Sequence, residues 1–373
     1  MPDLVAIDLP GGPAFVEAVV RAWDAGEAVA PIDRRLAPAA RRALLDVLRP
    51  AWVVGPRGRQ RCEGSLEVAE GDALVMATSG STGQPKGVVL THDAVAASAW
   101  ATSARLGTEP DRHRWLACLP LNHIGGLSVV TRALVTGVPL VVLDGFDAGA
   151  VRAAAGPDCL VSLVTSALAR VSGAPFYRVV LGGSAPPPEL PANVVTTYGM
   201  TETGSGLVYD GVPLDGAEVS ISPAGEVMVR GPMLMRGYRD GTVPFGPDGW
   251  FATGDGGRFG ADGKLEVSGR LSEMIITGGE NVWPMAVERI LRQHPGVTEV
   301  AVSGRPDPEW GERVVAWVVP DRRAGAPTLD DLRALVREQL AAFAAPRELV
   351  LVASLPKTTI GKLRRDELRG RAD

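Results

Sequence analysis

Short apolar segments rich in valine alternate along this chain with alanine-rich segments of helical period, and this alternation limits the fold more than any other feature of the sequence. Residues 14–26 and 37–50 have the apolar spacing of amphipathic helices, whereas residues 139–144, 159–164 and 178–183 are short, mainly apolar runs. Runs of that length and composition are typical of strands buried on both faces. The pattern predicts an α/β fold of layered sheets covered by helices.

The pattern changes twice towards the C-terminus. From about residue 212, apolar and polar residues alternate around glycine turns, which indicates antiparallel strands and a β-rich subdomain. After residue 270, a helix started by proline, a pair of strands and a helix with a capping box at Thr328 and Asp331 predict a small α+β domain. We therefore expect a large N-terminal domain over residues 1–270 and a small C-terminal domain on a hinge over residues 271–373.

Charge and cysteine content exclude several classes of function. The chain has 38 Lys and Arg against 43 Asp and Glu without a basic stripe, so nucleic acid is not an expected partner. Its cysteines are odd in number and widely spaced, which argues against disulfides and structural zinc and favours the reducing cytoplasm (Cys62, Cys118 and Cys159). We expect no signal peptide, because the first residues include an acidic residue and glycines where a basic patch and an apolar core would be needed. We expect no membrane span, because the longest apolar segment is short and is broken by Gly137 and Pro139.

The segment TSGSTGQPKG, residues 78–87, lies between two apolar runs. Its glycines permit unusual backbone angles, and its hydroxyl and backbone N–H groups can all point at one anion, as in a phosphate-binding loop. It is not a Walker A motif, because Pro85 stands where that motif has glycine, and Gly87 follows Lys86 where the motif has Ser or Thr. A flexible Ser/Gly surface turn is the alternative interpretation.

This loop resembles the phosphate loop of the adenylate-forming superfamily, which includes acyl- and aryl-CoA synthetases, luciferases and the adenylation domains of peptide synthetases. Six more segments resemble motifs of that family in the same order: LPLNHIGGL from Leu119, VVLGGSAPPP from Val179, TTYGMTETG from Thr196, FATGDGGRF from Phe251, GRLSEMIITGGENVWP from Gly269 and LPKTTIGKLRRDEL from Leu355. The resemblance runs from about residue 70 to the end of the chain. It implies an enzyme that uses ATP and Mg²⁺ to form an acyl-adenylate and then a thioester with coenzyme A.

The same resemblance implies a nucleotide site. Its residues are Thr78, Ser79, Gly80, Ser81, Thr82, Gly83, Lys86, Gly183, Ser184, Ala185, Pro186, Tyr198, Gly199, Met200, Asp255 and Arg270. In the family the tyrosine lies along adenine, and the residues matching Asp255 and Arg270 contact the ribose. Thr201 is implied in phosphate contact and Glu202 in Mg²⁺ binding. From the residues alone, Tyr198 and Glu202 are expected on a tight turn after a strand. Tyr198 is equally compatible with a core aromatic, and without the resemblance Asp255 is interpreted as an ordinary turn residue.

Two further catalytic residues are implied. His123 matches a residue beside the acyl carboxylate, and Lys362 matches the lysine that joins that carboxylate to the α-phosphate. The alternatives are a helix-cap or core histidine and a solvated lysine. In the family the C-terminal domain swings about a hinge after the Arg of GRLSE, which corresponds to Ser272, although the usual hinge residue is Asp or Lys. The swing brings a glycine-rich loop to the thiol, and this loop matches Gly278, Gly279, Glu280 and Asn281.

The segment before the phosphate loop is short, since the loop begins at Thr78. Together with LPLNHIGGL, GGSAPPP and GGENVWP, this shortening is similar to the o-succinylbenzoate:CoA ligases of menaquinone biosynthesis in high-GC bacteria. That resemblance implies an aromatic acid with a second carboxylate, for which Arg132 is a candidate, although a solvated arginine is equally compatible. The alternatives are another aryl- or acyl-CoA synthetase, an adenylation protein that loads a carrier protein, and an inactive nucleotide-binding regulator. A homodimer is compatible with all of them.

Overall fold

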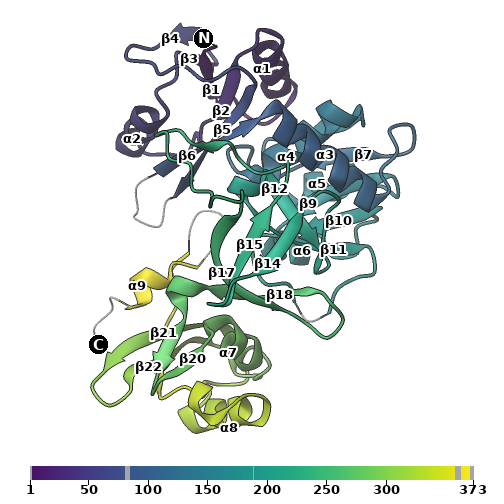
Figure 1. Cartoon of the computed structure of the whole chain (residues 1–373). Coiled ribbons are helices and arrows are strands. Elements are labelled where there is room, and N and C mark those ends of the chain that lie inside the picture. The colour runs from purple at the N-terminus through teal and green to yellow at the C-terminus, as the bar shows by residue number, and fades with distance from the viewer. Residues whose placement is uncertain (1, 80–84, 188, 358–362, 370–373) are drawn as a thin grey trace. The chain divides into compact units, whose positions relative to one another are not determined.

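The computed structural model describes residues 2–79, 85–187, 189–357 and 363–369 (Figure 1). The chain divides into two compact units: the first runs to Val219 and includes Val229–Phe251, and the second comprises Ser220–Met228 and the chain from Ala252 onward. The domain boundary predicted at residue 270 differs from this division into compact units. That the chain after residue 270 moves as one domain stays a prediction. The predicted fold class, layered α/β sheets with a β-rich part and a small α+β part, is confirmed.

The first unit contains two seven-stranded sheets. One has the strand order β16-β6-β5-β2-β1-β3-β4, and its central strands β5, β2, β1 and β3 are parallel. Two amphipathic helices connect the parallel strands, as the sequence predicted: α1 (Pro13–Asp24) and α2 (Pro38–Leu48). The strands of this sheet are β1 (Leu4–Ile7), β2 (Ala28–Pro31), β3 (Trp52–Gly55), β4 (Gly58–Arg61), β5 (Asp72–Ser79), β6 (Pro85–Thr91) and β16 (Gly237–Tyr238).

The other sheet of the first unit has the order β13-β12-β11-β10-β9-β7-β8. Its strands are β7 (Arg114–Ala117), β8 (Leu140–Val142), β9 (Cys159–Leu163), β10 (Arg178–Leu181), β11 (Val194–Met200), β12 (Ser205–Tyr209) and β13 (Val212–Pro213). The helices that accompany it are α3 (His92–Leu106), α4 (Ile124–Thr136), α5 (Ala148–Ala154) and α6 (Thr165–Arg170). Helix α3 contacts β5 and β6 of the first sheet and packs on α4, which contacts β7 and β9 of the second, so α3 and α4 lie between the two sheets (Figure 1).

The second unit contains a mixed five-stranded sheet and most of a four-stranded sheet, three strands of which begin or end in the first unit. The four strands are β14 (Glu218–Ile221), β15 (Glu226–Arg230), β17 (Phe251–Phe259) and β18 (Leu265–Arg270). The five are β19 (Ile275–Thr277), β20 (Glu280–Val282), β21 (Val297–Asp307), β22 (Gly311–Pro320) and β23 (Glu348–Leu351). Three helices accompany them: α7 (Pro284–Leu291), α8 (Leu329–Gln339) and α9 (Arg365–Arg369). The capping box predicted before α8 is confirmed, with Thr328 and Asp331 bonded to each other's backbone.

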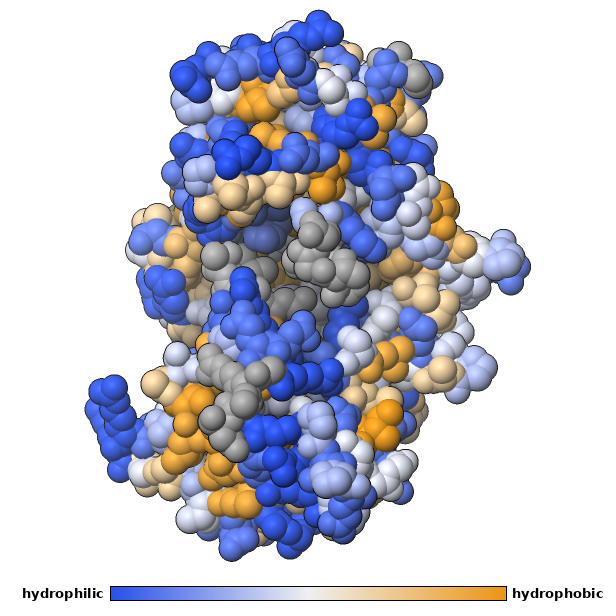
Figure 2. Space-filling view, turned by 90° about the vertical axis from the view of Figure 1, so that its left-hand side faces the viewer, coloured by the Kyte–Doolittle hydropathy of each residue, from blue (hydrophilic) through white to orange (hydrophobic). Residues whose placement is uncertain are grey.

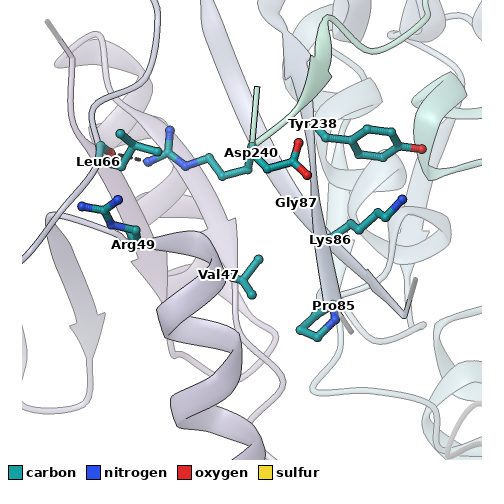
Figure 3. Close-up of a pocket in the computed structure, with 9 residues that line it drawn as sticks. Val47, Arg49, Leu66, Pro85, Lys86, Gly87, Tyr238 and Asp240 are labelled. Atoms are coloured by element: carbon teal, nitrogen blue, oxygen red, sulfur yellow. Dashed lines mark hydrogen bonds between the residues drawn. The ribbon is translucent and has the colours of Figure 1, made fainter. Parts of the chain in front are cut away.

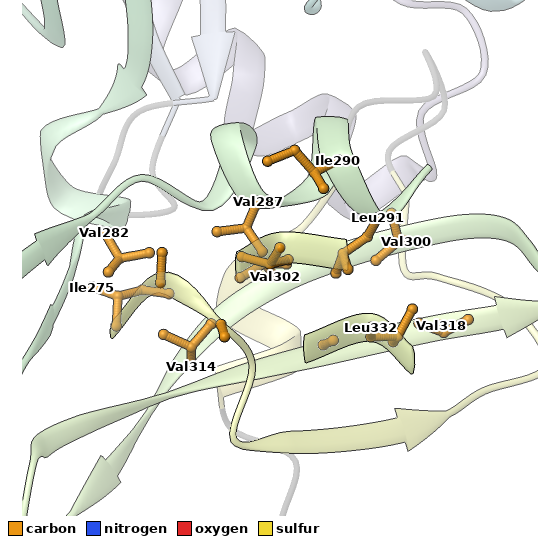
Figure 4. Close-up of a cluster of buried hydrophobic side chains, with 14 residues drawn as sticks. Ile275, Val282, Val287, Ile290, Leu291, Val300, Val302, Val314, Val318 and Leu332 are labelled. Atoms are coloured by element: carbon orange, nitrogen blue, oxygen red, sulfur yellow. The ribbon is translucent and has the colours of Figure 1, made fainter. Parts of the chain in front are cut away.

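The core of the five-stranded sheet follows from side-chain alternation along the strands. Val300 and Val302 of β21 face α7 and α8 together with alternate residues of β22 (Figure 4). The residues between them face the other side of the sheet, where Ala301 and Trp317 pack with Leu368 of α9. Both faces of this sheet are therefore covered, and Leu368 packs α9 into a separate hydrophobic cluster on the second face.

No helix in the described ranges is long and apolar enough to cross a bilayer. Figure 2 shows one face of the molecule, where hydrophobic residues occur in small groups separated by hydrophilic ones.

Candidate active site

The phosphate-binding segment joins two antiparallel strands of the first unit. Strand β5 ends at Ser79 and β6 begins at Pro85, and the register places Thr78 opposite Lys86. The turn itself, Gly80 to Gln84, lies outside the described residues. Because the two strands pair up to this point, Thr78 and Lys86 are fixed at the base of the loop.

The carboxylate predicted to bind metal is held by a neighbouring segment. Glu202 lies in a short 3-10 helix that follows β11, Thr201–Thr203. Its backbone carbonyl accepts a hydrogen bond from the Met235 N–H at 2.8 Å, and its Oε1 accepts one from the Tyr238 hydroxyl at 3.2 Å. The Lys86 ammonium lies over the Tyr238 ring, 4.9 Å from its centroid. Tyr238 was not singled out from the sequence, although it is one of only four tyrosines and follows a glycine.

Glycines let backbone segments approach closely around β10 and β11. A Cβ at Gly199 would overlap the carbonyl of Ser205, and one at Gly182 would lie 2.7 Å from the Thr197 hydroxyl. Gly183 has a φ of +84°. The chain from Gly183 to Pro186 is exposed. These residues therefore form an open backbone edge beside the end of β11, as a wall for a flat ring requires.

The structure corrects the placement of Tyr198. The sequence placed this tyrosine on a turn after a strand, but it lies within β11, paired with Val208 of β12. The change of direction comes later, at Thr201 and Glu202. Tyr198 is half-buried, so part of its ring remains exposed.

His123 occupies the N-cap position of α4, but its side chain makes no capping hydrogen bond. Its Nε2 is buried without a hydrogen-bond partner in the described part of the chain. Burial lowers the pKa of His123, whereas the Asp33 carboxylate acts to raise it, and Arg35 adds to the lowering. The interpretation of His123 as a satisfied cap is therefore wrong, and its Nε2 is available to another group.

Arg132 is not the solvated side chain that the sequence allowed. It is 1% exposed, because α4 is enclosed by neighbouring elements. Its Nη2 donates to the Ser205 hydroxyl at 2.6 Å, and its guanidinium lies 5.5 Å from the centroid of the Trp115 ring. Its Nε and Nη1 have no partner among the described residues, and neither does the hydroxyl of Ser128. A buried cation with free donors is costly unless an anion joins it.

In the second unit, Asp255 and Arg270 are cross-strand partners. The structure places Asp255 within β17 and not in a turn, opposite Arg270 of β18, where a bulge between Gly256 and Gly257 bends the strand. The Arg270 Nε is 3.1 Å from the Asp255 carboxylate, and its Nη1 donates to the Thr253 carbonyl at 2.8 Å. The two predicted ribose contacts are therefore adjacent, and Asp255 is buried while Arg270 is exposed.

The predicted hinge and thiol-side residues are also in the second unit. Ser272 lies in the 3-10 turn Leu271–Glu273, and its carbonyl accepts a hydrogen bond from Arg369 at 3.2 Å. Gly278 and Gly279 have φ values of +61° and +82° and make the two-residue turn between β19 and β20. Paired positive φ values are characteristic of a tight hairpin, and glycine adopts them without strain. Glu280 and Asn281 follow this turn and are exposed.

Lys362 lies outside the described residues, so the structure gives no position for it. The segment around it is closed by a bridge between Lys357 and Leu363. The Arg364 N–H donates to the carbonyl of Pro356 at 3.0 Å. The two ends of the segment that carries Lys362 are therefore fixed to each other.

The sequence matches the AMP-binding enzyme family over residues 63–239 and the AMP-binding enzyme C-terminal domain over residues 286–362. A probable 2-succinylbenzoate–CoA ligase of Mycobacterium tuberculosis is 41% identical over 349 residues, which covers 86% of this chain and 90% of that protein. The chain belongs to this family of AMP-binding enzymes. As predicted, it is an AMP-forming acid–CoA ligase.

Other AMP-binding enzymes support this placement. A 2-succinylbenzoate–CoA ligase of Listeria monocytogenes is 37% identical over 80% of this chain and 70% of its own length. The solved o-succinylbenzoate CoA synthetase of Bacillus subtilis, in complex with its acyl-adenylate intermediate, has a TM-score of 0.86 and 27% identity, covering 99% of this chain and 88% of that one. Another structure of the Bacillus subtilis enzyme holds ATP and a magnesium ion, at 28% identity and a TM-score of 0.85 over 98% of this chain and 89% of that one.

The donor set of this AMP-binding enzyme fits magnesium that arrives with ATP. The described residues contain no cluster of three or more His, Cys, Asp or Glu side chains that could hold a metal ion by themselves. Mg²⁺ usually binds through one or two carboxylates, with substrate phosphates and water completing its shell. Glu202 is a carboxylate of that kind, and a hydroxyl donor already orients one of its oxygens.

Proposed function

We propose that this ligase converts 2-succinylbenzoate to 2-succinylbenzoyl-CoA in the cytoplasm. A carboxylate oxygen of the acid attacks the α-phosphorus of ATP, and the bond to pyrophosphate breaks. The thiol of coenzyme A then attacks the acyl carbon, AMP leaves with the bonding electron pair, and the thiol proton passes to solvent. The product is a precursor in menaquinone biosynthesis.

The burial of Arg132, and its donors that pair with no described residue, are the observation that supports the substrate assignment. The acid has a second carboxylate that takes no part in the reaction and must be neutralised when it is buried. Among the residues that the structure describes, the Nε and Nη1 of Arg132 have no hydrogen-bond partner, and neither does the Ser128 hydroxyl on the same helix. These two nitrogens lie on different edges of the guanidinium, and each can donate a charge-assisted hydrogen bond to a carboxylate oxygen. An acid without the second carboxylate leaves this cation unpaired, which accounts for selectivity.

The first half-reaction brings together two anions, and the chain supplies opposing charge. Thr78, Lys86 and the loop between them hold the triphosphate. Glu202 holds the Mg²⁺, which neutralises phosphate charge when it is bound. Lys362 joins the acyl carboxylate to the α-phosphate, where negative charge develops. Tyr198 lies along the adenine, with Thr201 at the phosphate, Asp255 and Arg270 at the ribose, and His123 beside the acyl group.

The second half-reaction uses a different arrangement of the chain. The part after residue 270 rotates at Ser272, which withdraws Lys362 and brings the Gly278–Gly279 turn to the thiol path. Ser272 is followed by Glu273, so the hinge lacks the aspartate or lysine typical of the family. Domain rotation of this kind lets one site serve two chemical steps.

A panel of carboxylic acids tests the proposal. Pyrophosphate release and thioester formation are measured for 2-succinylbenzoate, benzoate and a medium-chain fatty acid, with and without coenzyme A. We expect 2-succinylbenzoate to give the highest kcat/KM and to need coenzyme A for thioester formation. A higher kcat/KM for a fatty acid would overturn the substrate assignment and leave the reaction class intact. Adenylation without any thioester would favour a protein that loads a carrier protein.

A further inference from the structure

The segment 235–240 connects the two charged groups that face the triphosphate in the proposed function. Its Met235 N–H and its Tyr238 hydroxyl both bond to Glu202, at 2.8 Å and 3.2 Å. The same tyrosine carries the Lys86 ammonium over its ring face. One residue therefore contacts both the carboxylate that binds metal and the lysine of the phosphate loop.

Tyr238 is fixed in place by the strand on which it lies. It pairs with Val88 in the β16–β6 ladder, and Gly237 pairs with Val89. Because β6 is also the strand that leaves the phosphate loop, Tyr238 and Lys86 belong to adjacent strands of one sheet. Figure 3 shows that both side chains extend to the same side of these strands, away from Arg49.

Two arginines flank Tyr238 and anchor its strand. Arg236 donates two hydrogen bonds to the buried Asp72 carboxylate, from Nε and from Nη2, and both nitrogen–oxygen distances are 2.9 Å. The buried Arg239 donates to the backbone carbonyls of Leu48 at 3.0 Å and Glu67 at 2.6 Å, and to that of Leu66. Because the residues on both sides of Tyr238 are anchored by hydrogen bonds, the backbone of the tyrosine has little freedom to move. Its hydroxyl therefore holds the Glu202 carboxylate in one position.

We propose that Tyr238 is a positioning residue for the adenylation step, an inference that rests on the proposed function. Its hydroxyl occupies one oxygen of Glu202 and turns the other toward Mg²⁺, and its ring holds Lys86 at the triphosphate. Removing a group that orients a metal ligand commonly lowers the metal affinity by a factor of about 10 to 100. We expect effects of about that size here.

Two substitutions separate the two contacts of Tyr238. Tyr238→Phe removes the hydroxyl and keeps the ring, whereas Tyr238→Leu removes both. The readouts are the Mg²⁺ concentration that half-saturates pyrophosphate release, and the dissociation constant of a non-hydrolysable ATP analogue measured by calorimetry with Mg²⁺ and with EDTA. Tyr177→Phe is the matched control, because Tyr177 packs against His113 and contacts none of these groups.

For Tyr238→Phe we expect a rise of about 10- to 100-fold in the half-saturating Mg²⁺ concentration and unchanged analogue binding in EDTA. Excess Mg²⁺ should restore most of kcat. Tyr238→Leu should also weaken binding in EDTA, because Lys86 loses its support. A wild-type Mg²⁺ dependence in Tyr238→Phe would overturn the proposal, as would equal loss of binding with Mg²⁺ and with EDTA. If no acid of the panel reacts, the proposed function fails, but the calorimetric comparison still decides the role of Tyr238.

Discussion

The Arg365 guanidinium donates a hydrogen bond to the Glu288 carboxylate across 2.6 Å, and both side chains are almost completely buried in the second unit. The Glu288 carboxylate also accepts hydrogen bonds from the backbone N–H of Val302 at 2.8 Å and from the Arg292 guanidinium at 3.2 Å. Arg365 is three positions after Lys362 and begins α9. The buried pair therefore fixes the chain that follows the predicted adenylation lysine.

Replacing Arg365 should destabilise the second unit far more than replacing its neighbour Arg364. Removing one partner of a buried ion pair leaves an uncompensated charge and costs ~3–5 kcal/mol. Arg364 pairs with Glu367 on the surface, where such a pair contributes ~0–1 kcal/mol. Urea unfolding of Arg365→Ala and Arg364→Ala, with hydrogen exchange of β21 and α7, measures both effects. Equal losses of stability would contradict the assigned burial of the pair.

Lys362→Ala should impair only the first half-reaction. A lost electrostatic contact to developing charge costs ~2.7–4 kcal/mol, which is about 10² to 10³ in rate. Adenylation of the acid should fall by at least that factor, while thioester formation from prepared acyl-adenylate stays nearly normal. Lys357→Ala is the control, since Lys357 forms a surface ion pair with Glu299 at 2.6 Å. If both half-reactions fall equally, Lys362 supports the fold and its assignment as the adenylation lysine is lost.

Arg132→Met should reduce selectivity for the acid with two carboxylates. Losing a hydrogen-bonded charge partner costs ~1.5–3 kcal/mol, so kcat/KM for 2-succinylbenzoate should fall roughly 10- to 150-fold. Turnover of benzoate should change little. The free energy of unfolding without substrate should fall by less than the ~3–5 kcal/mol typical of breaking a buried ion pair, because removing a buried cation whose Nε and Nη1 lack partners among the described residues offsets the lost hydrogen bond to Ser205. Unfolding of the variant, or an equal loss for both acids, would instead indicate a structural arginine.

The pKa of His123 predicts a pH dependence of stability. Burial holds this pKa below its ordinary value of 6.5. The unfolded chain therefore binds more protons than the native one between the folded pKa and 6.5, and the stability associated with neutral His123 is lost as the pH falls through that window. The difference in free energy of unfolding between wild type and His123→Gln should shrink from pH 7.5 to pH 5. A constant difference would mean that His123 titrates normally.

The thiols should differ in reactivity. Burial raises the pKa of Cys118 to about 12 and that of Cys159 to about 11, so neither forms a reactive thiolate near neutral pH. Cys62 is only partly buried, and burial raises its pKa as well. A disulfide reagent at pH 8 should modify one cysteine in the native protein and three in denaturant, with mass spectrometry locating the native adduct. Rapid native modification of Cys118 would contradict its burial.

Local features of this protein follow from the sequence. The helices at Pro13–Asp24 and Pro284–Leu291 match their apolar spacing and their starting prolines. The capping box of Thr328 and the Gly278–Gly279 turn involve neighbours in the chain, and backbone geometry determines them over a few residues. The order of the motifs was sufficient to identify the family.

Tertiary structure decided the contacts between residues far apart in the chain. The sequence allowed Arg132 to be either a carboxylate-binding or a solvated arginine, and only the enclosure of α4 made it a buried cation bonded to Ser205. Tyr238 has no local reason to meet Glu202, which lies 36 positions earlier, and Arg365 meets Glu288 across 77 positions. Such pairs form because packing of the sheets brings the segments together, and the resulting desolvation gives a buried charge or hydroxyl its energetic weight. Residue type and spacing along the chain do not contain that information.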